Sequence, residues 1–428
     1  MQELLYFMKN NILEAREKRS LEIKSHLSAN KVIICIKANI PGDNKSIKEA
    51  HVLVRLFTLL IQKKYDVKSS TLKKSEDGPY TLLEINSDEG YQIKKEMIAI
   101  EDTHPMGRFV DLDVFYQDGQ SLSRRALHID PRKCYLCQDD AHLCSRTQKH
   151  PISTLIEFIQ LEVKSYLKTL IQGYIEDSIL EELELEDKFG LVTPSSCGSH
   201  PDMDYQLMIR AKDAILPFLV DLFILGYQAE QLDHLIMQAK AIGIEAENKM
   251  FETTHGINAY KGLIYILGLA LVSLGYTVAQ QQDFKNIFEN MSILSESAYE
   301  DFDKEPITAG ISLYRKHNIT GIRGEAYRGI PSVLSALPLL IDHTDITLRN
   351  VLKHLILVSE DTVFLKRAHT IKHYNEIKDT LRQTDLNDQI QLKAFNQKTI
   401  QEHLSFGGSA DLLIVTIFLK AIHPIFFR

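Results

Sequence analysis

The pattern of apolar residues changes near residues 148–152, and this change limits the folds that the chain can adopt. Before it, strand-like runs stand between helical runs; after Pro151, one amphipathic helical segment follows another as far as Arg428. The 428 residues are also too many for a single hydrophobic core. We therefore predict two domains: an α+β domain with a mixed sheet at residues 1–150, and an all-α domain at residues 151–428.

Composition excludes some classes of partner. The net charge of −8 argues against bulk nucleic-acid binding, which needs a basic surface. The five cysteines are an odd number and three of them lie within "CYLCQDDAHLC", which fits a reducing compartment better than a disulfide framework. The first twenty residues lack the basic start and short apolar core of a signal peptide. We predict a cytoplasmic protein that binds no nucleic acid.

Two apolar runs have to be compared with membrane spans. Residues 262–279 carry no charge, but they include three glycines and lie between polar helical segments. A buried helix of a bundle explains this run better than a membrane span does. The second run begins at Ala410, is interrupted by Lys420, and is predicted to be too short to cross a membrane.

The stretch "GRFVDLDVFY", residues 107–116, is typical of a β-strand but contains two carboxylates. Because strand side chains alternate between faces, Asp111 and Asp113 project from the same face. Two unpaired carboxylates repel each other, whereas Mg²⁺ binds one or two carboxylates together with waters and substrate phosphates. The spacing predicts a catalytic Mg²⁺ site at these two aspartates, although a surface strand with solvated acids fits the spacing equally well.

Basic residues suited to phosphate occur on both sides of this strand in the sequence. They are Arg16, Lys45 in the turn "IPGDNKS", and Arg124 in "SRR". The planar guanidinium of arginine donates paired hydrogen bonds to phosphate oxygens. We predict that these three residues bind substrate phosphates; the alternative for each is a solvated surface charge.

The segment "RKCYLCQDDAHLCSRTQKH" concentrates metal-binding side chains. Cys134 and Cys137 form C-x-x-C, and His142 and Cys144 follow at short range, with His150 a little further on. Four such ligands can hold a tetrahedral zinc ion. We predict a structural Zn²⁺ site at Cys134, Cys137, His142 and Cys144; the alternative is a cluster of reduced cysteines packed in a turn.

Taken together, "GRFVDLDVFY", "SRR" and the cysteine segment resemble the apo-citrate lyase phosphoribosyl-dephospho-CoA transferase family, the holo-acyl-carrier-protein synthases of citrate lyase. The likeness covers most of residues 1–150 and implies a nucleotidyltransferase-like fold. The second half resembles the triphosphoribosyl-dephospho-CoA synthases in five blocks, which are "GLVTPSSCGSHPDMDY", "AENKMFETTHGINAYKG", "GIRGEAYRGIPSV", "SEDTVFLKRAHT" and "LSFGGSADLLIVTIFL". Together the two halves resemble a fused, bifunctional transferase.

The resemblance implies two consecutive reactions. The second half joins ATP to 3′-dephospho-CoA, releases adenine and forms 2′-(5″-triphosphoribosyl)-3′-dephospho-CoA. The first half transfers the phosphoribosyl-dephospho-CoA group to a serine of the citrate lyase acyl carrier protein, the γ subunit, and releases pyrophosphate. The first of these reactions needs a base for a ribose hydroxyl, stabilisation of a sugar with oxocarbenium character, and groups that hold the triphosphate.

The loop "SHPDMDY" supplies the first candidates for this chemistry. With the resemblance, His200 is predicted to bind substrate, Asp202 and Asp204 to bind Mg²⁺, and Asp204 to be catalytic. From the residues alone, an aspartate-rich helix start is the favoured explanation, because aspartate is common at helix N-termini.

Two glycine-containing helix starts supply phosphate-binding candidates, because free backbone N–H groups at a helix start bind anions. In "GINAYKG" these are Asn258 and Lys261, although Lys261 can simply bound a buried helix. In "FGGSADL" they are Gly407, Gly408 and Ser409, and Asp411 can be no more than a partner of the helix dipole.

In "GIRGEA", Glu325 is a second candidate for base or metal ligand and Arg323 for phosphate, the alternative being a structural ion pair. Glu247, Asp361 and Thr362 are weaker candidates.

The chain departs from the pattern of the synthase family at several positions. Cys197 and Val363 stand where asparagine is usual, Tyr260 replaces a histidine, and Ala368 and His369 replace glycines. These changes bear most on the loop that follows Thr362.

Two other functions fit the sequence. One is the same chemistry on the carrier protein of a malonate decarboxylase system. The other is a non-catalytic adaptor, in which the cysteine segment is a zinc module and the helical half binds proteins.

Overall fold

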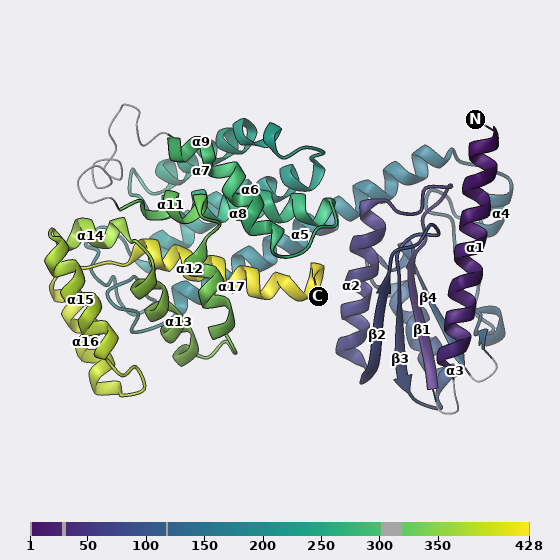
Figure 1. Cartoon of the computed structure of the whole chain (residues 1–428), viewed down its shortest axis with the longest axis horizontal. Helices are drawn as coiled ribbons and strands as arrows, with labels where there is room; N and C mark the ends of the chain where they lie inside the picture. The colour runs from purple at the N-terminus through teal and green to yellow at the C-terminus, as the bar shows by residue number, and fades with distance from the viewer. Residues whose placement is uncertain (1, 28–30, 117–118, 301–318, 428) are drawn as a thin grey trace. The chain divides into compact units, whose positions relative to one another are not determined.

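The computed structural model describes residues 2–27, 31–116, 119–300 and 319–427 (Figure 1). It consists of two compact units, the first reaching to Leu167 and including the residues from Pro424 on, the second formed by Lys168–His423. The division falls inside helix α5 (Ile152–Glu184). The change of pattern near residues 148–152 therefore marks the start of this helix, which begins in the first unit and ends in the second.

The first unit is built on a five-stranded sheet with the order β2-β3-β1-β4-β5. Its strands are β1 (Lys31–Ala38), β2 (Val67–Lys73), β3 (Tyr80–Asn86), β4 (Val110–Tyr116) and β5 (Gln120–Ser121). The predicted α+β class is confirmed, but the pairings are all antiparallel among the described strands, so the sheet is not mixed. The central strand β1 carries five consecutive buried residues, as expected for a strand covered on both faces.

Helices pack on this sheet and leave part of β4 accessible. Helix α2 (Lys48–Lys64) packs against β1 and β3, and α3 (Gly90–Thr103) packs against β4. Helix α1 (Gln2–His26) packs through Ile23 against Ile33 and Cys35 of β1. Along β4, the apolar residues Val110, Leu112 and Val114 are buried while Asp111 and Asp113 are half-buried, so the predicted alternation is confirmed.

The second unit is almost entirely helical, which confirms the predicted all-α class. After α5 its longer helices are α6 (Tyr205–Gln228), α7 (Ile236–Thr253), α8 (Lys261–Ala279), α9 (Asn286–Glu300), α13 (Asp345–Val358), α15 (Ile371–Gln383), α16 (Gln389–Gln401) and α17 (Gly407–Phe426). The described part of this unit also contains the short helices α11 (Gly321–Tyr327), α12 (Pro331–Ala336) and α14 (Thr362–Ala368). A small α4 (Ala141–Arg146) belongs to the first unit.

Glycines let α6 and α8 approach each other closely. A Cβ atom at Gly226 would lie 2.0 Å from the carbonyl oxygen of Val272, and one at Gly275 would lie 2.1 Å from that of Phe223. Any larger residue at these two positions would force the helices apart. This contact explains the glycine at position 275 of the apolar helix α8.

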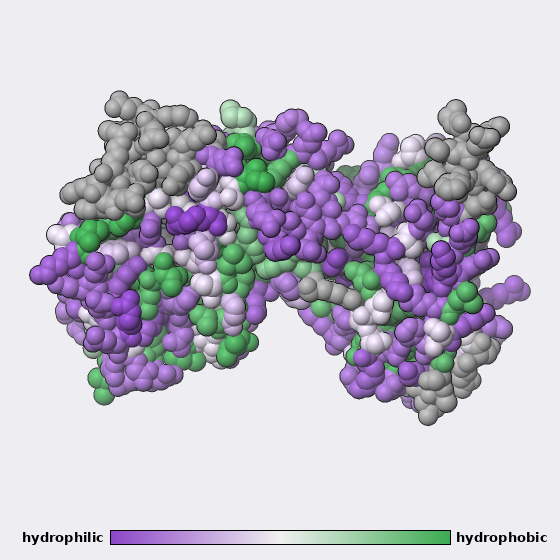
Figure 2. Space-filling model, in the orientation of Figure 1, coloured by the Kyte–Doolittle hydropathy of each residue, from purple (hydrophilic) through white to green (hydrophobic). Residues whose placement is uncertain are grey.

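Both apolar runs form helices that are mostly inside the second unit. By length and composition α8 and α17 could each cross a membrane, but 78% and 72% of their apolar windows are buried in the protein. The prediction that the second run is too short is wrong, because α17 extends over 20 residues and accommodates Lys420 with its amine near the carbonyl oxygen of Leu337. The face seen in Figure 2 is mostly hydrophilic, with separate hydrophobic patches, as expected of a soluble protein.

Candidate functional site

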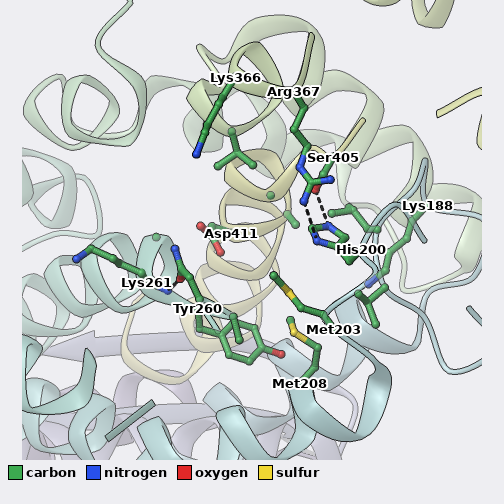
Figure 3. A pocket seen from close by; sticks show the side chains of 18 of the residues that line it. Lys188, His200, Met203, Met208, Tyr260, Lys261, Lys366, Arg367, Ser405 and Asp411 are labelled. Atoms are coloured by element: carbon green, nitrogen blue, oxygen red, sulfur yellow. Dashed lines mark hydrogen bonds between the residues drawn. The ribbon is translucent and has the colours of Figure 1, made fainter. Parts of the chain in front are cut away.

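A pocket of about 690 Å³ in the second unit, here called the central pocket, collects residues from four of the five sequence blocks (Figure 3). Its walls come from the end of α5, the loop that leads to α6, the start of α8, helix α14 and the start of α17. Of the predicted residues, His200, Asn258, Lys261 and Gly407 line it, as does the weaker candidate Thr362. The fold therefore brings together segments that are far apart in the sequence.

His200 holds an arginine in this pocket. Its Nδ1 accepts a hydrogen bond from a guanidinium nitrogen of Arg367 at 3.0 Å, so its Nε2 carries the hydrogen and donates to Oγ of Ser405 at 2.9 Å. Burial, and then the positive charge of Arg367, lower the pKa of His200 to about 4. His200 is therefore neutral at physiological pH and positions Arg367.

Arg367 and its neighbour Lys366 are the functional candidates that sequence analysis missed. Arg367 also donates to the carbonyl oxygens of Ser199 and His403, both at 3.0 Å, which fixes the plane of its guanidinium group. Lys366 lines the same pocket and is exposed. The sequence feature that could have identified them is the adjacent pair of basic residues within "SEDTVFLKRAHT".

Asp361 joins the starts of two helices. Its Oδ1 accepts hydrogen bonds from the N–H groups of Val363 and Phe364 in α14, and its Oδ2 from the N–H and the hydroxyl of Ser409 in α17, at 2.9 to 3.0 Å. A Cβ atom at Gly408 would lie 3.1 Å from the carboxyl carbon of Asp361, so glycine permits this close contact. Ser409 is fully buried in the contact and does not face the central pocket.

The predicted acidic residues lie elsewhere or have partners. Oδ1 of Asp204 accepts from the N–H of Leu207 at 2.7 Å and caps α6, as the helix-start alternative expects. Asp202 is exposed, and neither aspartate lines the central pocket. Glu325 is buried and accepts from Oγ of Ser332 at 2.6 Å.

The start of α8 lines both the central pocket and a second pocket of about 320 Å³. The side chain of Asn258 accepts from the N–H of Lys261 at 3.1 Å, and the amine of Lys261 pairs with Glu247 at 2.7 Å. Arg323 lines this second pocket, together with Glu247 and Lys261.

In the first unit, Asp111 and Asp113 share one face of β4, as predicted, and both have positive neighbours. The amine of Lys37, which lies opposite Asp111 on β1, is 3.5 Å from Asp111 and 4.0 Å from Asp113. Arg132 pairs with Asp111 at 2.7 Å and also with Glu101. Burial raises the pKa of Asp113. The spacing along the sequence does not reveal these partners.

The three predicted phosphate ligands of the first unit have protein partners. Arg16 pairs with Asp77 at 3.0 Å, and Arg124 pairs with Glu101 at 2.8 Å. The amine of Lys45 donates to the carbonyl oxygen of Ile40. Lys45 also lines a pocket of about 1160 Å³ within this unit, to which other basic side chains and the cysteine segment contribute.

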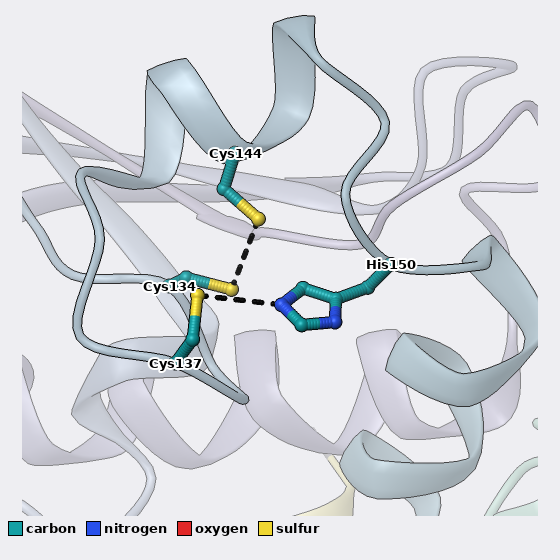
Figure 4. A group of neighbouring side chains, drawn as sticks. All are labelled: Cys134, Cys137, Cys144 and His150. Atoms are coloured by element: carbon teal, nitrogen blue, oxygen red, sulfur yellow. Dashed lines mark hydrogen bonds between the residues drawn. The ribbon is translucent and has the colours of Figure 1, made fainter.

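The cysteine segment forms a compact group of four ligands (Figure 4). Ligand atoms of Cys134, Cys137, Cys144 and His150 all lie within 4.8 Å of one another. The sulfur atoms of Cys134 and Cys144 are 3.4 Å apart, and Nε2 of His150 is 3.3 Å from the sulfur atom of Cys137. The group is consistent with a metal site, but its histidine is His150 and not the predicted His142.

His142 lies in the first turn of α4, where its side chain is exposed. The chain returns past α4 to bring His150 to the sulfur atoms, and spacing alone could not reveal this return. Among the residues that the structure describes, this is the only such group of three or more His, Cys, Asp or Glu ligands.

Comparisons with known proteins agree with this division. Residues 8–166 match the family of apo-citrate lyase phosphoribosyl-dephospho-CoA transferases, and residues 168–425 match that of ATP:dephospho-CoA triphosphoribosyl transferases. Proteins named CitXG from Haemophilus influenzae and Leuconostoc mesenteroides are 27% and 29% identical over 95% of this chain and 94% and 96% of their own lengths. A probable 2-(5″-triphosphoribosyl)-3′-dephosphocoenzyme-A synthase of Lactiplantibacillus plantarum is 34% identical over 58% of this chain and 96% of its own length.

Both matched activities concern dephospho-CoA derivatives, with ATP and a carrier protein as the other substrates. The chain belongs to the ATP:dephospho-CoA triphosphoribosyl transferase family and carries that domain fused to an apo-citrate lyase phosphoribosyl-dephospho-CoA transferase domain, as a bifunctional enzyme of citrate lyase prosthetic-group synthesis.

Proposed function

We propose that the central pocket binds ATP and 3′-dephospho-CoA, and that the face of β4 with Asp111 and Asp113 serves the transfer to the γ subunit of citrate lyase. The observation that carries the first part is Arg367, which His200 holds at a pocket wall beside Lys366. Two adjacent cations in a partly enclosed site suit the phosphates of both substrates.

The free cysteines and the burial of α8 and α17 support a cytoplasmic location.

The chain's own residues then have separate tasks. Arg367 and Lys366 hold phosphate groups while the 2′-hydroxyl of dephospho-CoA approaches the sugar carbon that carries adenine. The start of α8 also lines the pocket, and there the N–H of Gly262 can donate to a further phosphate oxygen, whereas that of Lys261 is already bonded to Asn258. Holding both nucleotides in one pocket supplies the proximity that a reaction between two bound molecules requires.

The transfer site is suited to a divalent cation. Asp113 has no hydrogen-bond partner among the described residues, and its side chain is 35% exposed, so its oxygens are available. Mg²⁺ bound at Asp111 and Asp113 would take the place of the Lys37 amine and would neutralise the leaving pyrophosphate. Arg132 stays paired with Asp111 and orients it.

The carrier protein can be tested directly. We expect the full-length protein, supplied with ATP and radiolabelled dephospho-CoA, to release adenine and to label the apo form of the citrate lyase acyl carrier protein. The label is counted on the carrier after gel electrophoresis, with a serine-to-alanine carrier as the control. Label on a malonate decarboxylase carrier alone would assign the protein to that system, and a failure to release adenine would favour the adaptor.

We further propose that the group of Cys134, Cys137, Cys144 and His150 binds zinc. Three thiolates and one imidazole are a common tetrahedral donor set for structural zinc, and the separations allow one ion to reach all four. We expect one equivalent of zinc by elemental analysis, and Cys137→Ser to lose it and to lower the melting temperature of the first unit. His142→Ala is the matched control and should keep the metal. Zinc retained by Cys137→Ser but lost by His142→Ala would contradict this ligand set.

A further inference from the structure

A small recess opens beside the central pocket, and Asp411 in the first turns of α17 lines both. The recess also borders Gly262, Thr362 and Val363, which the central pocket shares. In Figure 3, Asp411 lies amid the labelled side chains, with Lys366 and Arg367 on one side and Tyr260 on the other. Asp411 therefore lies between the basic side chains and the start of α8.

Six carboxylates line the central pocket or the recess. Five of them have hydrogen-bonded or ionic partners, which are Lys188 for Glu182, His373 for Glu402, Ser332 for Glu325, Thr320 for Glu360 and Ser409 for Asp361. Asp411 is the sixth and makes no hydrogen bond or ion pair within the described part of the chain. It is also partly exposed, whereas Asp361, Glu182 and Glu325 are buried.

The surroundings of Asp411 favour a carboxylate that takes up a proton. A Cβ atom at Gly262 would lie 2.1 Å from Oδ2 of Asp411, so the carboxylate is in close contact with the start of α8. Burial, and then the negative charges of Asp361 and Glu182, raise the pKa of Asp411 well above its ordinary value. A general base works best when its pKa lies near the working pH.

We propose that Asp411 is the general base that removes the proton from the 2′-hydroxyl of dephospho-CoA, an inference that rests on the proposed placement of both substrates in the central pocket. The hydroxyl oxygen forms a bond to C1′ of the ATP ribose as the bond from C1′ to N9 of adenine breaks. The electron pair of the broken bond leaves with adenine. The proton taken by Asp411 returns to the departing base directly or through water, so neutral adenine is released.

The main test is Asp411→Asn in the full-length protein. General base catalysis contributes about 10²- to 10⁴-fold, so kcat for adenine release should fall by that factor. The KM values for ATP and dephospho-CoA should stay within about threefold, because the amide keeps the shape of the side chain. A kcat within about tenfold of the unmodified protein would overturn the assignment.

Chemical rescue separates a proton acceptor from a structural side chain. Asp411→Ala leaves space for a small carboxylate, and added formate should raise its rate of adenine release in proportion to the formate concentration, with chloride as the control. A rate that formate leaves unchanged would count against Asp411 as the base.

The pH profile gives a test that needs no variant to fold. Asp361 and Glu182 act on Asp411 through their negative charges, and Tyr260 is coupled to it in the same way. The other titratable or charged groups that share its pocket or recess are Lys188, His200, Lys261, Lys366, Arg367, His369, Glu402, His403, Glu325 and Glu360. Because only the deprotonated carboxylate accepts a proton, kcat should rise tenfold per pH unit below an apparent pKa above that of an ordinary aspartate. A kcat that stays constant down to about pH 5 would contradict the proposal.

Lys366→Met distinguishes failure of this inference from failure of the proposed site. It should raise KM for the substrate whose phosphates Lys366 holds. If it does so while Asp411→Asn keeps a normal kcat, the site is correct and the base is another group. If neither variant affects adenine release, the central pocket is not the synthase site.

Discussion

Replacement of both Asp111 and Asp113 by asparagine should lower the rate of transfer to the carrier protein by at least about 100-fold, while adenine release stays unchanged. Asparagine keeps the size of each side chain but removes the charge that would hold a divalent cation against the leaving pyrophosphate. The two half-reactions can be followed separately, by adenine release and by label transferred from the purified intermediate to the carrier. An equal loss in both would show that the substitutions act through folding.

Asp66→Asn is the matched control, since Asp66 is an exposed acid of the first unit that pairs with Lys68 and with no other described residue. Metal binding can be measured apart from activity, by titrating Mn²⁺ into the protein and following the free ion by paramagnetic resonance. We expect the double variant to lose one binding event that Asp66→Asn retains. If Mn²⁺ binding is unchanged, the two aspartates serve only to pair with Lys37 and Arg132.

Arg367→Met should lower kcat/KM for adenine release by about 10- to 150-fold, because hydrogen bonds to charged groups contribute about 1.5–3 kcal/mol. Transfer of preformed intermediate to the carrier should be unaffected. Steady-state kinetics with each substrate varied in turn will show which of the two nucleotides Arg367 holds. Arg382→Met, which removes an exposed arginine paired with Asp379 in α15, is the control.

Arg367 also bonds two carbonyl oxygens and His200, so its loss can destabilise the pocket wall. Arg367→Lys keeps the charge without the paired donors and should give an intermediate loss of kcat/KM. Thermal denaturation of each variant measures how much of the loss of kcat/KM comes from destabilisation of the pocket wall. Normal kcat/KM in a folded Arg367→Met protein would remove Arg367 from the site.

Local periodicity explains what the sequence could predict. The alternation along residues 110–116 placed Asp111 and Asp113 on one face, because the side-chain period of a strand needs no knowledge of the rest of the fold. The helical pattern after Pro151 predicted the class of the second unit for the same reason. One helix cap was also readable, as the helix start at Asp204 shows, whereas the length of α17 was underestimated.

Partners that meet only through the tertiary fold could not be predicted. Lys37 lies opposite Asp111 because β1 pairs with β4, and no spacing reveals that register. His150 joins the cysteines because the chain turns back after α4, whereas His142 was nearer in sequence. Arg367 acquires its role from His200, which is 167 positions away.

The contact made by Asp361 has a consequence for how the enzyme meets its substrates. The positive ends of α14 and α17 already hold an anion of the protein itself, so a phosphate group would have to compete with a permanent occupant there. Attraction of the nucleotides then falls mainly to side chains such as the exposed Lys366, whose charge dissolved salt screens. Substrate affinity should therefore weaken steadily as ionic strength rises. The affinity of a phosphate site buried among backbone amides would depend less on ionic strength.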